Sequence, residues 1–193
     1  MKRIVLTGGP GAGKTIISSA IAAGDARRYC RVPEAATQVY NVLHTRWDLL
    51  DAAGRRAVQR RIYQLQREQE EALARASPAK TLLLDRGTVD GAAYWPDGPD
   101  DYWRALGTTA GAELARYDAV IWMQTGAALG VYDRNASNPV RFESPDVAIA
   151  SGDALRALWG AHPRLYAVDA YPTLAEKLAA VRRVIEGVRG GNE

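Results

Sequence analysis

The chain has 193 residues, of which 47% are hydrophobic and 24% are charged, and its formal net charge is +3 at pH 7. This is the balance of an ordinary globular protein, and the length is enough for one domain with a full core. The mild positive charge suits phosphorylated ligands and argues against a long nucleic-acid footprint. The single cysteine, Cys30, excludes an intramolecular disulfide. With no run near the roughly 20 apolar residues of a membrane span and no signal-peptide pattern, we expect a cytoplasmic protein without a membrane partner.

The first predicted elements are a strand, a glycine-rich loop and a helix. Arg3–Thr7 is a short apolar run typical of a buried strand, and residues 8–15 read GGPGAGKT, which matches G-x-x-x-x-G-K-[ST] without a mismatch. Residues 16–23 then follow helical spacing. This order predicts a phosphate-binding loop in which backbone N–H groups and the start of the helix hold an anion. The alternative is a chance match in a glycine-rich loop.

We assign the loop to the phosphates of a nucleotide. Lys14 supplies positive charge for the terminal phosphates, and the Thr15 hydroxyl is a predicted ligand of Mg²⁺, which prefers oxygen ligands. The predicted nucleotide-binding residues here are Gly9, Gly11, Ala12, Gly13, Lys14, Thr15 and Ile16.

Further along, a short second strand ends at Pro33, which cannot continue a central ladder. Residues 35–44 and 51–76 have helical apolar spacing, and the longer helix is able to pair with a second copy as a homodimer. Residues 81–85 form a continuous apolar strand. Residues 88–94 are predicted to start a helix, and residues 95–100 to form a loop.

The second half of the chain continues the alternation of strands and helices. We predict helices at 101–106, 109–116, 151–160 and 173–188, strands at 119–123 and 165–169, and a lid at 126–145, where periodicity is weak. Strands that alternate with helices predict a parallel sheet with right-handed crossovers, here in one domain spanning 1–193. Ligands of such sheets bind beyond the carboxyl ends of the strands.

Charged residues follow two of these strand ends. Asp85 has the place of a carboxylate that organises Mg²⁺, and Arg86 is suited to hold a phosphate or a substrate oxygen. Glu34 is expected to face the same cleft, where it can accept the proton of an attacking hydroxyl. Each of the two carboxylates could instead have a purely structural role. Asp85 could cap the next helix, and Glu34 could be an ordinary acidic residue in the first turn of a helix.

Two other groups of residues are candidates for ligand contacts. Arg134 and Arg141 flank a polar turn in the predicted lid, where they can close over a triphosphate, the alternative being a solvated loop. A third arginine, Arg156, comes later. The residues that could contact the acceptor are Tyr40, Trp47, Tyr63, Gln66, Arg67, Tyr94 and Trp95. The alternative is that Gln66 and Arg67 lie on a solvated helix face and that the aromatic residues pack in the core or at its rim.

Together these motifs resemble a known family. The matching stretches are Gly8–Thr15, VPEAA at 32–36, DRG at 85–87 and VDA at 168–170, in that order along nearly the whole chain. They look like those of small P-loop kinase-like proteins often described as AAA-domain ATPases, near nicotinamide riboside kinases and the deoxynucleoside and thymidylate kinases. The resemblance implies a three-layer α/β/α sandwich with a five-stranded parallel sheet, nucleoside-kinase-like with a small lid, that binds ATP and Mg²⁺.

The resemblance also implies roles for individual residues. Glu34 would be the general base, Asp85 and Arg86 would act at the metal and the phosphates, and Arg134 and Arg141 would belong to the lid. The adenine would lie against Ala170, Tyr171 and Pro172. Gly87 stands where deoxynucleoside kinases usually have Ser or Tyr, and residues 40–67 match no substrate signature, so the acceptor stays open.

The sequence therefore predicts a kinase that transfers phosphate from ATP to a hydroxyl of a small, nucleoside-like molecule. Arg86 follows Asp85 where ring-forming AAA+ motors carry Glu, and no N-K-x-D motif is present to indicate a GTPase switch. Two alternatives remain, a nucleotide-dependent regulator that acts through a partner and a polynucleotide end kinase. The choice between ATP and GTP is also open.

Overall fold

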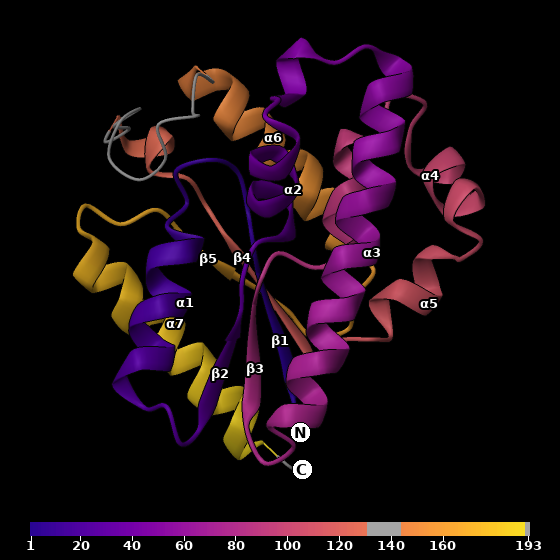
Figure 1. Ribbon diagram of the computed structural model, residues 1–193. Helices are drawn as coiled ribbons and strands as arrows, with labels where there is room; N and C mark the ends of the chain where they lie inside the picture. Colours follow the sequence, from indigo (N-terminus) through magenta and orange to yellow (C-terminus); the bar gives the residue numbers. More distant parts are fainter. Residues whose placement is uncertain (131–143, 192–193) are drawn as a thin grey trace.

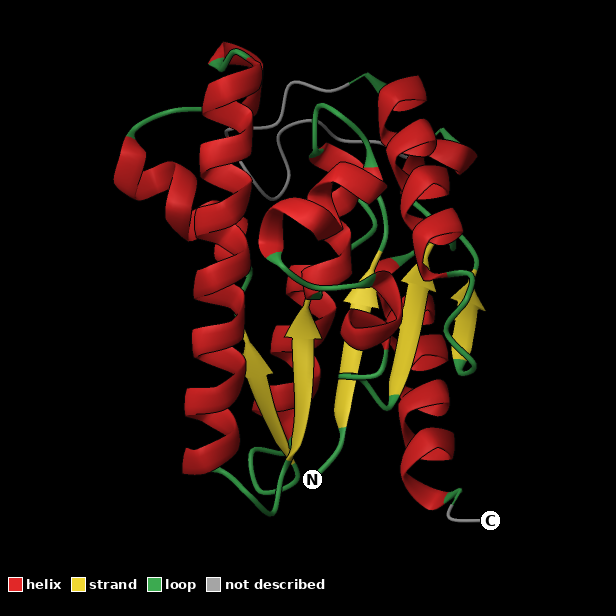
Figure 2. Ribbon diagram, turned by 90° about the vertical axis from the view of Figure 1, so that its right-hand side faces the viewer, coloured by secondary structure: helices red, strands yellow, loops and turns green. Residues whose placement is uncertain are grey.

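The computed structural model of the chain describes residues 1–130 and 144–191. Five parallel strands form one sheet in the order β2-β3-β1-β4-β5. Their bounds are β1 (Arg3–Thr7), β2 (Tyr29–Val32), β3 (Thr81–Asp85), β4 (Ala119–Met123) and β5 (Leu165–Val168). All five arrowheads point to the same edge in Figure 2, as a parallel sheet requires. The predicted five-stranded parallel sheet is thus confirmed.

Helices cover both faces of the sheet and complete the predicted three layers (Figure 1). One face carries α1 (Lys14–Gly24) and α7 (Leu174–Gly190). The other carries α3 (Ala52–Ala76), α4 (Pro99–Leu106), α5 (Ala110–Leu114) and α6 (Pro145–Trp159). The short α2 (Ala35–Leu43) packs on α3. Three 3₁₀ helices connect these elements: η1 (Trp47–Leu49), η2 (Thr88–Tyr94) and η3 (Gly126–Leu129).

The two faces bury different kinds of side chain. Successive residues of a strand point to opposite faces, so Ile4 and Leu6 of β1 belong to the α1/α7 side and Val5 to the other. The α1/α7 cluster is mainly aliphatic. The opposite cluster contains many aromatic rings, among which Trp159 and Tyr102 are almost fully buried. We call these the aliphatic face and the aromatic face of the sheet.

Most predicted elements are found within two residues of their predicted ends, but α6 begins six residues earlier than expected. Its start is set by Ser144, whose Oγ accepts a hydrogen bond from the Val147 N–H at 3.3 Å, and by Pro145 at the first helical position. In the same way Pro99 starts α4 inside the stretch predicted as a loop. Residues 88–94 are helical as expected, although they form a 3₁₀ helix.

The ends of the predicted lid, 126–145, belong to η3 and to the first residue of α6. Residues 131–143 lie outside the described residues, so the lid remains a prediction. None of the helices within 1–130 and 144–191 is long and apolar enough to cross a membrane.

The glycine-rich loop packs directly against α6. A Cβ atom on Gly9 would lie 2.2 Å from the Ala148 carbonyl oxygen, a distance too short for any side chain, and 3.1 Å from the Gly152 nitrogen. Only glycine permits such an approach of two backbones.

Candidate functional site

The loop between β1 and α1 has the geometry of an anion site. Gly13, which precedes α1, has a φ of 88°, in the left-handed region that glycine enters at little cost. Because Gly13 has no side chain to cap α1, the first N–H groups of this helix are available to a phosphate. The hydroxyl of Thr125 donates to the Pro10 carbonyl at 2.6 Å and so attaches the loop to the end of β4.

Lys14 is buried, and its side chain lies over its own loop. Its Nζ donates to the carbonyl oxygens of Gly8 at 2.7 Å and Gly9 at 3.0 Å. Thr15, the next residue, is exposed at the start of α1. Both residues line the cavity described below, as their predicted roles at the phosphates require.

Asp85 lies on the α1 side of the sheet and is completely buried. Its Oδ2 accepts a hydrogen bond from Arg31 Nη2 at 2.8 Å, and Arg31 Nε in turn donates to Ser18 Oγ of α1 at 3.0 Å. Its Oδ1 has no hydrogen-bond partner among the described residues. The alternative role as a helix cap is not realised, since Gly87 is the residue that precedes η2.

The orphaned Asp85 oxygen fits a hydrated Mg²⁺ ion, because such a buried acceptor needs a donor such as metal-bound water. Thr15 and Asp85 are the residues that would hold the ion beside the phosphates. No group of three or more His, Cys, Asp or Glu that could bind a metal occurs in the described part of the chain. Mg²⁺ does not need such a group, because it often takes one or two protein oxygens and the rest from phosphates and water.

Arg86 turns away from Asp85 and toward the opposite, aromatic face. Its φ of 78° lies in the left-handed region, which costs a residue with a side chain on the order of 1–3 kcal/mol. Its Nε donates to Glu34 Oε1 at 2.6 Å, and its Nη1 donates to Asp90 Oδ2 at 3.2 Å. A strained backbone that aims a guanidinium between two carboxylates makes Arg86 a candidate functional residue.

Glu34 precedes α2 but does not cap it. Besides the bond from Arg86, its Oε2 accepts a hydrogen bond from the Thr37 hydroxyl at 2.6 Å. Burial alone would raise the pKa of Glu34, but the positive charges of Arg86 and Lys14 outweigh it and hold the pKa at about 2. The carboxylate is therefore ionised at physiological pH and belongs to the same charged cluster as Lys14 and Arg86.

Asp90 was not identified from the sequence, although it completes this cluster. It is buried and accepts hydrogen bonds from Thr7 Oγ1 at 2.9 Å and from Trp159 Nε1 at 2.6 Å, in addition to Arg86. Burial raises the pKa of Asp90, and the nearby Arg86 opposes the rise without cancelling it. The one available signal was its spacing of four residues from Arg86.

A cavity of about 640 Å³ adjoins this cluster and extends between α2, α3, η2 and α6. Its phosphate end is lined by Lys14, Thr15, Glu34, Arg86 and Asp90. The remainder has mainly aromatic and neutral polar walls that include Tyr40, Trp47, Gln59, Tyr63, Gln66, Tyr94 and Ser151, and Arg46 also lies there. The cavity thus joins the phosphate loop to a compartment large enough for a small organic molecule.

Three residues suggested for the acceptor or the phosphates lie elsewhere. Trp95 is buried in the aromatic face and donates its indole N–H to Asp101 at 2.7 Å. The guanidinium of Arg67 lies over the Tyr63 ring, and that of Arg156, an exposed residue, lies over the Trp122 ring. None of the three lines the cavity. Arg134 and Arg141 lie outside the described residues, so their predicted contacts with phosphate remain predictions.

The loop predicted to contact the base, Ala170 to Pro172, connects β5 to α7. The Ala170 N–H donates to Gln124 Oε1 at 3.3 Å, and Tyr171 packs against the aliphatic face. Near it, Lys177 of α7 is buried and donates to the Gln124 carbonyl, and its burial lowers its pKa to about 8.

A sequence model of a known family, described as an AAA domain, matches residues 3–177. The chain belongs to this AAA-domain family. It is therefore a nucleotide-binding P-loop domain of the NTPase or kinase-like type. The sequence motifs imply the same broad class. No curated protein matches the sequence.

Proposed function

We propose that this AAA-domain protein is an ATP-dependent phosphotransferase whose acceptor is a small, nucleoside-like molecule with a free hydroxyl. The cavity of about 640 Å³ is the observation that carries the proposal, because it begins at Lys14 and Thr15 and continues past Glu34 and Arg86. Hydrolysis of a nucleotide needs room only for water, whereas transfer to a second substrate needs a compartment of this kind.

In the proposed reaction, the acceptor hydroxyl oxygen attacks the γ-phosphorus of ATP. The bond from the γ-phosphorus to its bridging oxygen breaks, ADP leaves, and the hydroxyl proton passes to Glu34 and then to solvent. Lys14 and the N–H groups at the start of α1 bind the phosphates, and Arg86 stabilises the transferred group. When bound, Mg²⁺ would neutralise charge on the phosphates, and Arg134 and Arg141 would add positive charge from the predicted lid.

The low pKa of Glu34 defines what this residue contributes. A carboxylate with a pKa of about 2 is always ionised but is a weak base. Phosphoryl transfer passes through a loose transition state and depends more on position than on deprotonation. Glu34 therefore acts mainly by orienting the acceptor hydroxyl, for which it must exchange one of its bonds to Arg86 or Thr37.

The walls of the cavity favour an acceptor with a flat ring. Tyr40, Trp47 and Tyr94 supply aromatic surface, and the amide of the buried Gln59 offers both a donor and an acceptor. Such walls fit the ring of a nucleoside, whose sugar would then lie toward Glu34.

A second candidate function is a nucleotide-dependent regulator that acts through a partner. Exposed hydrophobic side chains gather at the end of α2 and in η1, where Val42, Leu43 and Leu49 are each more than half exposed. They adjoin Trp47 at the wall of the cavity, so a protein partner in contact with them would lie close to the site.

The two functions are distinguished by ADP release from Mg²⁺·ATP with hydroxyl-bearing acceptors, namely nucleosides, small alcohols and a 5′-hydroxyl oligonucleotide. We expect release well above the acceptor-free rate with a nucleoside-like compound. Lys14→Ala should lower turnover about 10³-fold, and Glu34→Gln about 10²-fold with nucleotide binding retained. Slow release that no acceptor accelerates would favour the regulator, and stimulation by the oligonucleotide alone would favour an end kinase.

A further inference from the structure

Arg86 needs an explanation beyond its side-chain contacts, because its backbone is held in the left-handed region by its neighbours. Its N–H donates to the Leu6 carbonyl at 3.0 Å, a contact that continues the pairing of β3 with β1. Its carbonyl oxygen accepts a hydrogen bond from Gln66 Nε2 at 3.2 Å. The side chain of Gln66, on α3, therefore bonds directly to the strained peptide of Arg86.

The Gln66 amide can act in this way only if its NH₂ group, and not its oxygen, faces Arg86. Gln66 is 3% exposed on α3, and its Nε2 also donates to Glu70 Oε1, one turn later, at 2.9 Å. An ionised carboxylate accepts hydrogen bonds and donates none. Glu70 therefore selects the amide orientation in which NH₂ lies between its own oxygen and the Arg86 carbonyl.

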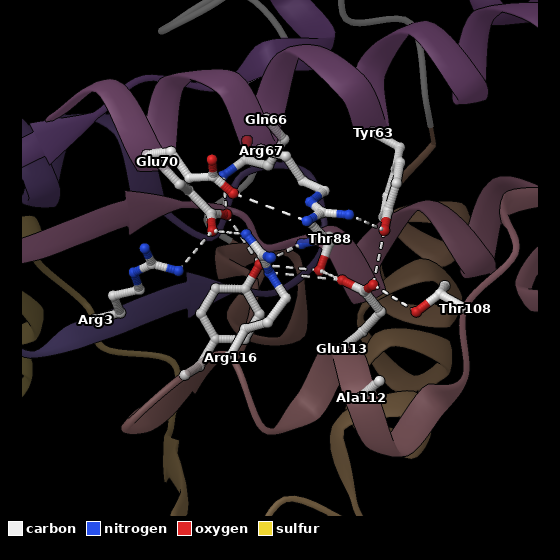
Figure 3. Close-up of polar contacts among 12 residues, drawn as sticks. Arg3, Tyr63, Gln66, Arg67, Glu70, Thr88, Thr108, Ala112, Glu113 and Arg116 are labelled. Carbon is white, nitrogen blue, oxygen red and sulfur yellow. Dashed lines mark hydrogen bonds and ion pairs between the residues drawn. The ribbon is translucent and has the colours of Figure 1, made fainter. Parts of the chain in front are cut away.

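Glu70 is itself fixed from several sides, as Figure 3 shows. It is fully buried, and its oxygens accept hydrogen bonds from Arg116 Nη2 at 2.7 Å and the Tyr117 hydroxyl at 2.9 Å. Arg3 Nη1, at the start of β1, lies 3.8 Å away. These partners come from β1 and from the segment between α5 and β4, so the carboxylate is tied to the sheet and not to α3 alone.

We propose that Gln66 and Glu70 are positioning residues for Arg86. Glu70 orients the Gln66 amide, Gln66 holds the left-handed peptide of Arg86, and the guanidinium is thereby aimed between Glu34 and Asp90 at the phosphate end of the cavity. This inference rests on the proposed function only where it assigns Arg86 to the transferred phosphoryl group.

The test compares Gln66→Met with Gln69→Met in the full chain. Gln69 is a matched control because it lies on the same helix and donates to Gln38 Oε1 at 2.9 Å and not to the Arg86 peptide. One readout is solvent exchange of the Arg86 Nε–H, followed by ¹⁵N NMR and assigned as the resonance absent from Arg86→Lys. The other is ADP release from Mg²⁺·ATP with water as the acceptor, which requires no knowledge of the natural acceptor.

Gln66→Met should speed Nε–H exchange about fivefold or more, the effect of one lost hydrogen bond, and should lower turnover about tenfold. Gln69→Met should change neither by more than about twofold. Glu70→Gln keeps the side-chain volume but lets the Gln66 amide rotate, and it serves as the second variant if Gln66→Met does not fold. It should also speed the exchange of the Arg86 Nε–H relative to wild type.

The inference is overturned if a folded Gln66→Met or Glu70→Gln protein keeps wild-type Nε–H exchange, even if its turnover falls, because the loss would then not act through Arg86. It is also overturned if Gln69→Met has the same effects as Gln66→Met. Wild-type protein that releases no ADP with any acceptor would refute the proposed function, while the exchange measurement would still decide whether Gln66 positions Arg86.

Discussion

The two faces of the sheet differ in how they are held, although the same five strands supply both. On the aliphatic face, side chains such as Leu83, Ile121 and Ile185 pack without direction. On the aromatic face, ring hydroxyls and indoles donate to buried carboxylates: Tyr63 to Glu113, Tyr117 to Glu70 and Trp159 to Asp90. Apolar contacts stabilise a fold, whereas hydrogen bonds to charged groups also fix positions and angles. The cavity lies on the face whose positions are fixed in this way.

The largest effect is expected where the aromatic face loses a charge. Arg116→Met removes the closest cation from the fully buried Glu70, and an uncompensated buried charge typically costs about 3–5 kcal/mol of unfolding free energy. Urea denaturation measures this loss. As a control, Arg75→Met breaks an exposed pair with Glu71 and should cost less than about 0.5 kcal/mol. Equal losses of unfolding free energy in the two variants would mean that the buried ion pair stabilises the fold no more than the exposed one does.

On the aliphatic face, a substitution should affect stability alone. Ile185→Ala leaves a cavity at a fully buried position of α7 and should lower the unfolding free energy by about 2–4 kcal/mol. ADP release measured well below the melting temperature should stay within about twofold of wild type, because no bond to the site is lost. Val42→Ala, at an exposed position of α2, is the control and should change neither quantity. A tenfold fall in turnover of Ile185→Ala would contradict the expectation that substitutions on the aliphatic face affect only stability.

The smallest effect concerns Lys177, a buried lysine on the aliphatic face. Its folded pKa of about 8 lies below the ordinary value of 10.5, so between these values the unfolded chain binds more protons and the stability of the wild type should rise with pH. Lys177→Met removes this rise. It should also stabilise the protein at pH 7 by about 1 kcal/mol, because a buried ammonium is costly and the lost hydrogen bond offsets only part of that cost.

Stability curves at pH 7 and pH 10 check this last prediction. Lys80→Met, at the half-buried lysine before β3, should keep the wild-type rise. If Lys177→Met keeps it as well, Lys177 does not hold a buried charge in the folded protein.

Sequence patterns predicted the parts of the site that depend on local order. The glycine-rich loop, Glu34 and the Asp85-Arg86 pair follow strand ends, and the carboxyl ends of parallel strands meet at one edge of the sheet. The pattern did not show that Asp85 and Arg86 serve opposite faces. Alternation along β3 favours that outcome, but the direction of Arg86 depends on its left-handed backbone, which only the surrounding contacts produce.

Three buried carboxylates on the aromatic face, Glu70, Asp90 and Glu113, were missed by sequence reasoning. Glu70 lies in the run QREQEE of α3, which reads as a solvated helix face, and Asp90 and Glu113 lie in short helices with no catalytic pattern. Their burial follows from donors distant in the sequence, such as Arg116 and Trp159, and one sequence does not reveal such pairings. The start of α6, in contrast, was signalled by Ser144 and Pro145 and could have been predicted.

The contact between Gly9 and α6 has a mechanical consequence. Two backbones meet there with no side chain between them, so no rotamer change is available to absorb a small displacement. A shift of α6 toward the loop would therefore press directly on the peptide groups around Gly9. Because residues at the start of α6 also line the cavity, a ligand that moved this helix would act on the glycine-rich loop by direct backbone contact.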